Sequence, residues 1–120
     1  MPPDERDAAY LWDMLDSARV IRDFTADVPF DQYMSDRKLQ LAVERSVEII
    51  GEAARRVSDH YRQAHPDIPW RRIIAQRHVL VHEYGEIEDQ LLWRVATERI
   101  PDLIRMLEPL VPPPDTTDTP

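Results

Sequence analysis

The sequence predicts an all-α protein that folds as an up-and-down bundle of four to five helices. Apolar residues recur at intervals of three and four along most of the chain, and no segment shows the alternation of a β-strand. Most of the 11 prolines lie near the two ends, and there are only 2 glycines, so long interior stretches are free of helix breakers. A length of 120 residues fits one domain with a modest core.

The first helix is expected to begin after Asp4, whose side chain suits an N-cap, and to end near Thr25, before the turn that contains Pro29. Its apolar residues follow three- and four-residue spacing, which places them on one face of an amphipathic helix. These residues are Tyr10, Leu11, Met14, Leu15, Ala18, Ile21 and Phe24.

A second helix is expected to begin near Phe30 or Ser35 and to run to about Ser58. Gly51 lies inside it, where a glycine costs about 1 kcal/mol relative to alanine. Two alanines follow shortly after, and we interpret this small-residue stretch as a point where another helix approaches closely. The expected buried stripe consists of Leu39, Ala42, Val43, Ser46, Val47, Ile50, Ala53, Ala54 and Val57.

The third helix follows a polar connection over residues 59–68 that can hold a short helical turn. Pro69 suits the first turn of a helix, so we expect the third helix to start there. It should run to about Glu83 or Tyr84, where Gly85 provides a C-terminal stop.

The fourth helix is expected to open at Ile87 and to continue to Leu107, with Pro101 kinking or dividing it. Beyond it the composition changes to proline, threonine and aspartate, which is typical of disordered segments. The sequence therefore predicts a helical domain over residues 1–111 and a disordered tail over residues 112–120.

The composition also restricts the chemistry and the location of the protein. The chain has no cysteine, so disulfides and thiolate metal sites are excluded. No apolar run approaches the ~18 residues of a membrane span, and the acidic N-terminus lacks the pattern of a signal peptide. We therefore expect a cytoplasmic protein that does not associate with membranes.

The net charge of −8 argues against a general nucleic-acid coat protein, but the charge is unevenly distributed. Residues 1–40 carry nine acids and five bases, residues 41–80 five acids and seven bases, and residues 81–120 nine acids and three bases. A local cationic site inside an acidic protein suits one phosphate or a small anion better than a long nucleic-acid backbone.

One stretch, residues 77–85, concentrates reactive side chains: Arg77, His78, His82, a carboxylate and Tyr84 lie close together among three aliphatic residues. Arginine stays cationic and forks around phosphate oxygens, whereas histidine titrates near neutral pH. Such a pair can cleave RNA without a metal. The histidine acts on the attacking 2′-hydroxyl or the leaving oxygen, and the arginine stabilises charge on phosphorus.

The spacing of Arg77 and His82 creates a geometric problem on one helix. Each residue advances about 100° around the axis, so two residues five apart diverge by roughly 140°. The long arginine side chain could wrap back, or a second copy of the chain could complete the site. We favour the second copy, because Trp70, Trp93 and the stripe around Gly51 offer more packing surface than one small bundle needs.

Zinc binding is an alternative for the two histidines, because His78 and His82 are four residues apart and share a helix face. The further ligands would have to come from Glu83, His60 or His65, and the pattern lacks a recognised motif. We expect no metal here.

Arg77-x4-His82-x-Tyr84, with the polar His78 directly after the arginine, resembles the R-x4-H-x-Y motif of the HepT-like toxins in the HEPN superfamily. Several other segments are similar to that family in the same order: residues 49–54 (IIGEAA), residues 66–70 (PDIPW), Trp93 and residues 100–103 (IPDL). The resemblance covers roughly residues 8–108.

The resemblance implies a HEPN-like helical homodimer, the toxin of a type II toxin–antitoxin pair, with metal-independent endoribonuclease activity and no cofactor. Arg77 and His82 would be the catalytic pair at the dimer interface, and His78 the accompanying polar residue. Tyr84 matches the tyrosine that a minimal nucleotidyltransferase antitoxin can modify with AMP, which would block RNA. Five helical arginines are candidates for holding the RNA substrate, and Arg71 and Arg72 are the two that we assign to it; the others are Arg45, Arg55 and Arg56.

A second function stays open at this point: a non-catalytic helical subunit that partners a nucleotidyltransferase and presents its substrate or nucleotide. The acidity of residues 81–120 favours it, since acids near the cleft would repel RNA. A purely structural dimer is the third possibility.

Overall fold

The protein is described by a computed structural model that covers residues 2–82 and 86–112, and it describes only the backbone of residues 77–82 and 86–87. All regular secondary structure in these ranges is helical, which confirms the predicted all-α class. The elements are α1 Glu5–Thr25, α2 Phe30–Ser35, α3 Arg37–Arg56, α4 Asp59–Ala64, α5 Trp70–His82, α6 Glu86–Arg94, the π-helix η1 Val95–Arg99 and α7 Ile100–Leu107.

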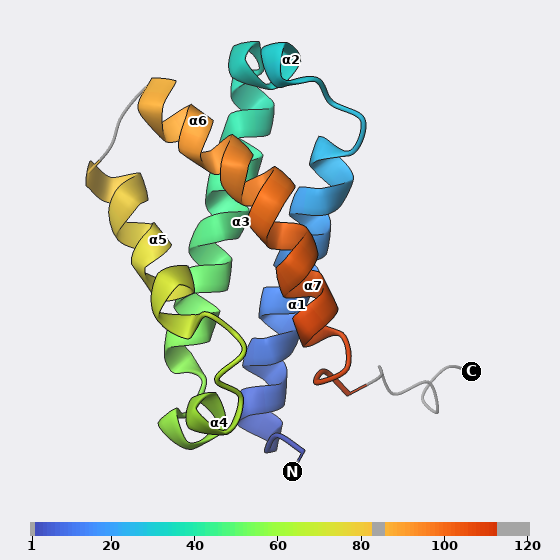
Figure 1. Ribbon diagram of the computed structural model, residues 1–120, viewed down its shortest axis with the longest axis vertical. Helices are drawn as coiled ribbons and strands as arrows, with labels where there is room; N and C mark the ends of the chain where they lie inside the picture. Colours follow the sequence, from blue (N-terminus) through green and yellow to red (C-terminus); the bar gives the residue numbers. More distant parts are fainter. Residues whose placement is uncertain (1, 83–85, 113–120) are drawn as a thin grey trace.

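The long helices run alternately up and down, as the sequence predicts (Figure 1). α1 and α3 pack together as the central pair, α5 packs on α3, and α7 packs back on α1. The rod formed by α6, η1 and α7 crosses in front of α1 and α3, while short helices α2 and α4 lie at opposite ends of the bundle (Figure 1). α3 thus packs against both α1 and α5.

The start of α1 is the N-cap that the sequence predicts. The Asp4 carboxylate accepts a hydrogen bond from the backbone N–H of Asp7 at 2.7 Å. Along α1 the predicted apolar face is buried except near its two ends, where Tyr10 is half-buried and Phe24 is 50% exposed. Leu11, Met14 and Ala18 have no exposed surface.

Of the two predicted starts of the second helix, Ser35 lies close to the observed start of α3 at Arg37. A helix continuous from Phe30 is wrong, because the chain breaks at Asp36 into α2 and α3. Asp36 has extended backbone angles and caps α3, accepting from the N–H of Leu39 at 3.0 Å. The buried amide of Gln40 donates to the carbonyls of Tyr33 and Met34 at the end of α2. The break is stable because both helix ends have hydrogen-bond partners.

The rest of α3 agrees with the expected stripe. Val43, Val47, Ile50 and Ala54 are at most 2% exposed. Gly51 is buried on this helix, which packs against both α1 and α5. Burial on a helix between two neighbours fits the interpretation of Gly51 as a close-packing residue.

The fourth helix is divided near Pro101, as predicted. The turn ahead of it widens into η1, where the N–H of Ile100 bonds to the carbonyl of Val95. Proline has no N–H to offer to the preceding turn and its ring needs room there, so a wider turn relieves the clash. Thr97 donates its hydroxyl to the carbonyl of Trp93 at 2.8 Å and further stabilises this turn.

α5 begins at Trp70, directly after Pro69, in agreement with the sequence. The predicted stop at Gly85 and most of the predicted tail lie outside the described residues. In the part of the chain that the structure describes, no helix is both long and apolar enough to cross a bilayer.

Candidate active site

The residues of the reactive stretch belong to the last turns of α5. The backbone of Arg77, His78 and His82 is α-helical, while their side chains, and Glu83 and Tyr84 entirely, lie outside the described part of the structure. Because the helix stays regular to His82, the Cα positions of Arg77 and His82 diverge by about 140° around its axis. The divergence expected from the spacing therefore applies to the folded chain.

The N-terminal end of α5 is held by contacts that begin on α1. Asp7, 5% exposed, accepts hydrogen bonds from the backbone N–H of Ser58 at 2.9 Å and from its hydroxyl at 2.7 Å. Ser58 in turn caps α4 by accepting from the N–H of Tyr61 at 3.2 Å. A buried carboxylate thus connects α1 to the junction between α3 and α4.

From α4 the contacts continue to α5. The rings of Tyr61 and His65 lie 4.3 Å apart between centroids, and the indole N–H of Trp70 donates to the His65 carbonyl at 2.9 Å. Ile73, one turn further along α5, is buried in the core. The first turn of α5 is thereby held against the end of α4, which is itself linked to α1 and α3 through Ser58. These contacts set the orientation of the helix axis on which Arg77 and His82 lie.

The fold bears on the zinc alternative as well. His60 lies in α4 and His65 is its C-cap, so both are at the N-terminal end of α5. His82 is twelve residues after Trp70, or about 18 Å further along the helix. Within one chain His60 and His65 cannot complete a set with His82.

Arg71 and Arg72, the predicted RNA-binding residues, are exposed on the first turn of α5. Both line an open groove of about 1000 Å³ that also includes Trp70 and Arg62. Arg62 forms an ion pair with Asp59 on α4. Trp70 itself is only 7% exposed, so the groove offers mainly the cationic side chains of Arg71 and Arg72, which suit the phosphates of a nucleic-acid strand.

Two arginines of the acidic C-terminal segment were not predicted to belong to a binding site. Arg94 and Arg99 border η1, and Arg99 lies close enough to Arg72 for their charges to interact. Burial lowers the pKa of Arg99, and repulsion from Arg72 and then Arg94 lowers it further. The charge of each sequence segment does not reveal the cluster of Arg72, Arg94 and Arg99, because the cluster forms between helices that are distant in sequence.

Two acids near the start of α6, Glu88 and Asp89, interact with residues of α3. Burial raises the pKa of Glu88, which is 7% exposed, and repulsion from Glu44 on α3 and from Asp89 adds to it. Burial also raises the pKa of Asp89, opposed by the attraction of Arg37 on α3. These two carboxylates thus interact with α3 rather than with the Arg72–Arg99 side, which weakens the objection that this segment repels RNA.

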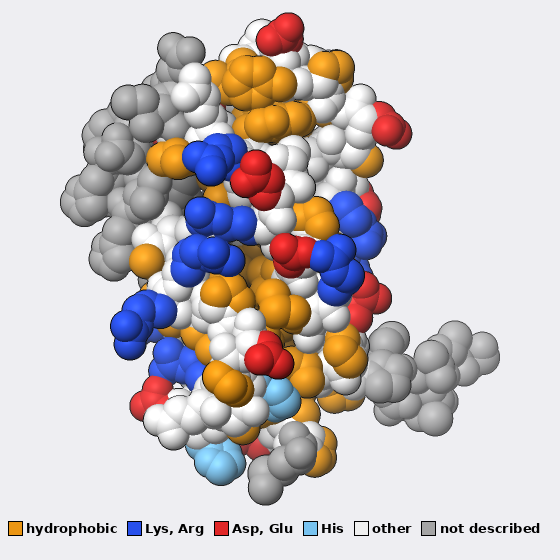
Figure 2. Space-filling model, in the orientation of Figure 1, with side chains coloured by type: hydrophobic (Ala, Val, Ile, Leu, Met, Phe, Trp, Pro, Cys, Tyr) orange, Lys and Arg blue, Asp and Glu red, His pale blue; other side chains and the backbone are white. Residues whose placement is uncertain are grey.

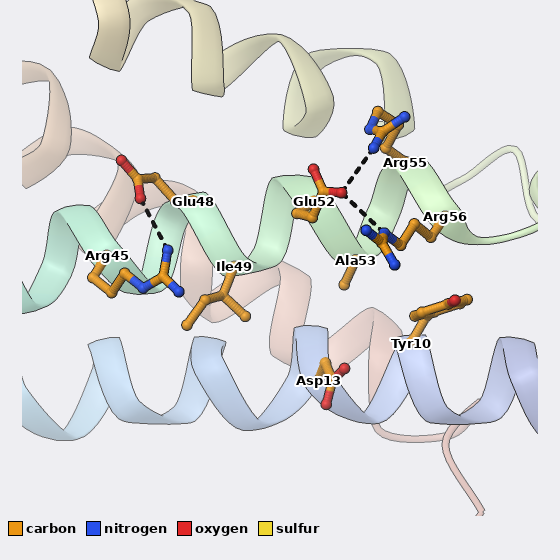
Figure 3. A pocket seen from close by; sticks show the side chains of 9 residues that line it. All are labelled: Tyr10, Asp13, Arg45, Glu48, Ile49, Glu52, Ala53, Arg55 and Arg56. Atoms are coloured by element: carbon orange, nitrogen blue, oxygen red, sulfur yellow. Dashed lines mark hydrogen bonds and ion pairs between the residues drawn. The ribbon is translucent and has the colours of Figure 1, made fainter.

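A second groove, of about 660 Å³, lies between α1 and α3 (Figure 3). Its three arginines pair with acids of the same groove: Arg45 with Glu48 at 3.3 Å, and both Arg55 and Arg56 with Glu52. Such internal pairing leaves little free charge for an anionic ligand.

The residue pattern and the bundle agree with one protein family. The family model "Ribonuclease HepT-like" matches residues 14–110, which include all of α5 and the complete Arg77–Tyr84 motif. The chain belongs to the HepT-like ribonuclease family. The resemblance inferred from the sequence is confirmed.

HepT-like proteins of other organisms align with nearly the whole domain. The Thermococcus cleftensis protein named "Probable ribonuclease HepT" is 37% identical over 101 residues, covering 84% of this chain and 92% of its own length. A Methanocaldococcus jannaschii protein named "Putative RNase MJ1380" is 34% identical over 100 residues, covering 83% of this chain and 92% of its own. No solved structure matches the chain at a significant level.

Proposed function

We propose that this HepT-like chain is the toxin of a type II toxin–antitoxin pair: a cytoplasmic, metal-independent endoribonuclease that acts as a homodimer. The observation that carries the proposal is the match of the family model across the Arg77–Tyr84 motif. The regular backbone of α5 supports the dimer, because one helix directs Arg77 and His82 about 140° apart.

His82 and Arg77 divide the chemistry. The imidazole of His82 takes the proton of a ribose 2′-hydroxyl, whose oxygen attacks the adjacent phosphorus. The bond to the 5′-oxygen breaks, and that oxygen takes up a proton from the imidazolium. The products are a 2′,3′-cyclic phosphate and a 5′-hydroxyl end. Arg77 stabilises the extra negative charge on the phosphoryl oxygens, and His78 is the polar neighbour that assists it.

The antitoxin is a minimal nucleotidyltransferase that modifies Tyr84. The tyrosine hydroxyl gives up its proton to solvent and its oxygen attacks the α-phosphorus of ATP. The bond between the α-phosphorus and the bridging oxygen breaks, pyrophosphate leaves, and AMP remains on the tyrosine oxygen. The added phosphate and nucleoside place negative charge and bulk beside the catalytic pair, and RNA is excluded. Coexpression with such an enzyme should add the mass of one AMP to the peptide containing Tyr84, and Tyr84→Phe should abolish the addition.

The first test is cleavage of a defined RNA by the purified chain in the presence of EDTA. Cleavage should persist with the chelator and should vanish in His82→Ala, whose circular dichroism and melting temperature should match the parent. An unchanged rate in His82→Ala would refute the catalytic assignment. Binding of a nucleotidyltransferase without cleavage at any protein concentration would favour the non-catalytic subunit instead.

The second test asks whether the site spans two copies. Arg77→Ala and His82→Ala should each be inactive alone. In an equal mixture that exchanges subunits freely, half of the dimers are mixed, and one of their two sites regains both side chains. Activity should therefore return to about one quarter of the parent value in a two-fold dimer. A mixture as inactive as its components, with exchange verified by mass spectrometry, would place both residues of a site in one chain.

A further inference from the structure

A cationic cleft lies between α5 and the η1–α7 segment. Two adjoining cavities, of about 180 and 70 Å³, share Gln76, Val95 and Arg99 in their walls. Arg72 from α5 lines the larger cavity and Arg94 the smaller one. Figure 2 shows Lys and Arg side chains gathered in a column down this side of the molecule, where α5 faces the α6–η1–α7 rod.

The arginines of this cleft carry charge that their surroundings do not neutralise. Among the described residues neither Arg72 nor Arg99 forms an ion pair, and Arg94 has only a long contact of 3.8 Å with exposed Glu98. For Arg99, half-buried, burial and then repulsion from Arg72 and Arg94 lower the pKa. A bound anion would relieve this repulsion.

Among the described residues, the two carboxylates that line the cleft form no ion pair with Arg72 or Arg99. Asp67 and Asp102 both line the larger cavity. Asp102 is paired with Arg105 on the next turn of α7, and Asp67 is exposed on the connection ahead of α5. Burial and then repulsion from Arg72 and Arg94 lower the pKa of Arg99, and each outweighs the attraction of Glu98, which raises it.

The cleft is continuous with the groove at the start of α5. Arg72 lines both, and Arg71 and Arg62 line the groove beyond it. Arg72 is five residues, or about 7.5 Å along the helix, from Arg77. The cationic surface therefore extends along the helix that carries the catalytic motif. In a protein of net charge −8, this is the surface that a polyanion would approach.

We propose that Arg72 and Arg99 bind backbone phosphates of the RNA strand that neighbour the phosphate at which the strand is cleaved. Arg94 lies at the edge of the same subsite. The inference rests on the proposed ribonuclease function and adds where the substrate lies. The contacts are to phosphate, so they position a single strand without reading its sequence. η1 holds Arg99 opposite Arg72, which assigns the widened turn a part in substrate binding.

The test is RNA binding in a catalytically silent background. A fluorescently labelled single-stranded RNA is titrated with His82→Ala, and with the same chain carrying Arg72→Gln, Arg99→Gln or both, over a range of salt. Each substitution should weaken binding about tenfold at low salt, and the slope of log K against log salt should fall by about 0.7 per lost phosphate contact. In the active chain Arg99→Gln should raise KM and leave kcat unchanged.

Arg45→Gln is the matched control, because Arg45 is an exposed arginine in the α1–α3 groove, paired with Glu48 (Figure 3). It removes one charge and should leave affinity within twofold of the parent. Equal affinity in Arg72→Gln, Arg99→Gln and the parent would overturn the proposal. So would an equal loss in Arg45→Gln, since the effect would then be one of net charge alone.

A second measurement separates failure of this site from failure of the proposed function. Inorganic phosphate is titrated while the guanidinium NMR signals of Arg72 and Arg99 are followed. If the parent cleaves RNA and the two variants behave like it, only the cleft assignment fails. If RNA is neither bound nor cleaved but phosphate shifts both signals, the anion subsite stands without the ribonuclease. If phosphate shifts neither signal and RNA is not bound, both proposals fail.

Discussion

Removing the Asp7 carboxylate should destabilise the protein more than any exposed acid on α1. Asp7 is 5% exposed and accepts two hydrogen bonds from Ser58, which lies 51 residues later in the chain. Asp7→Ala deletes both bonds at once. It leaves the backbone N–H of Ser58 without a partner and weakens the hold of α1 on the α3–α4 junction that leads to α5.

The magnitude follows from the geometry of the two bonds. At 2.9 and 2.7 Å they are short, and a hydrogen bond to a charged acceptor contributes about 1.5–3 kcal/mol. The two bonds share one carboxylate and are not additive, so we expect a loss of about 3 kcal/mol in the free energy of unfolding. At roughly 3–5 °C per kcal/mol for a domain of this size, the melting temperature should fall by about 10–15 °C.

The assay is urea unfolding followed by circular dichroism, with Asp16→Ala as the control. Asp16 is an exposed acid on the same helix, and its replacement should change stability by less than about 0.5 kcal/mol. A double-mutant cycle with Ser58→Ala should show a coupling energy of about 1–2 kcal/mol. Equal midpoints for Asp7→Ala and Asp16→Ala, or no coupling, would show that this contact does not connect the helices.

Three further changes test the core. The pKa of Glu88 is raised, so its ionisation destabilises the native state, and stability should decline as pH rises from about 4 through the raised pKa. Glu88→Gln should flatten that decline, measured as urea midpoints against pH, and should add about 1 kcal/mol of stability at pH 7. Gly51→Leu should lower the free energy of unfolding by about 1–3 kcal/mol through overpacking, and Gly51→Ala should lower it much less, as measured by thermal melts. Trp70→Phe should cost about 1 kcal/mol in urea unfolding by removing the indole N–H donor, one of the two donors to the His65 carbonyl; the other is the backbone N–H of Ile68.

The helices could be predicted where local signals agree. Asp4 caps α1, Pro69 precedes α5, and Pro101 forces the division of the last rod, each by chemistry confined to a few neighbouring residues. The start of α3 also has a local signal, because Asp36 caps it as Asp4 caps α1, but the end of α2 depends on Gln40 of the next helix and could not be predicted in the same way. Gln40 is polar and does not belong to the expected apolar stripe. It is nevertheless buried, and its amide donates a hydrogen bond to the Tyr33 carbonyl at the end of α2.

The candidate site shows the same division. The motif on α5 can be read from spacing alone, since its residues are neighbours in sequence. The proximity of Arg72 and Arg99 cannot, because 27 residues separate them and a π-helical turn shifts the register after Arg94. Counting charge by segment placed Arg94 and Arg99 in an acidic region, although their nearest charged neighbours in the fold include another arginine.

The register of α5 connects the cationic cleft with the half-site. Arg72 and Gln76 differ by about 40° around the helix, so they share the face that lines the cleft. Relative to Gln76, the Cα of Arg77 lies about 100° to one side and that of His82 about 120° to the other. A strand bound along the cleft face of one copy would therefore pass the two catalytic positions on opposite flanks. If a second copy packs beside one flank, it can supply the missing residue there, so the loss of phosphate binding in Arg72→Gln and the recovery of activity in mixed dimers test the same arrangement from its two sides.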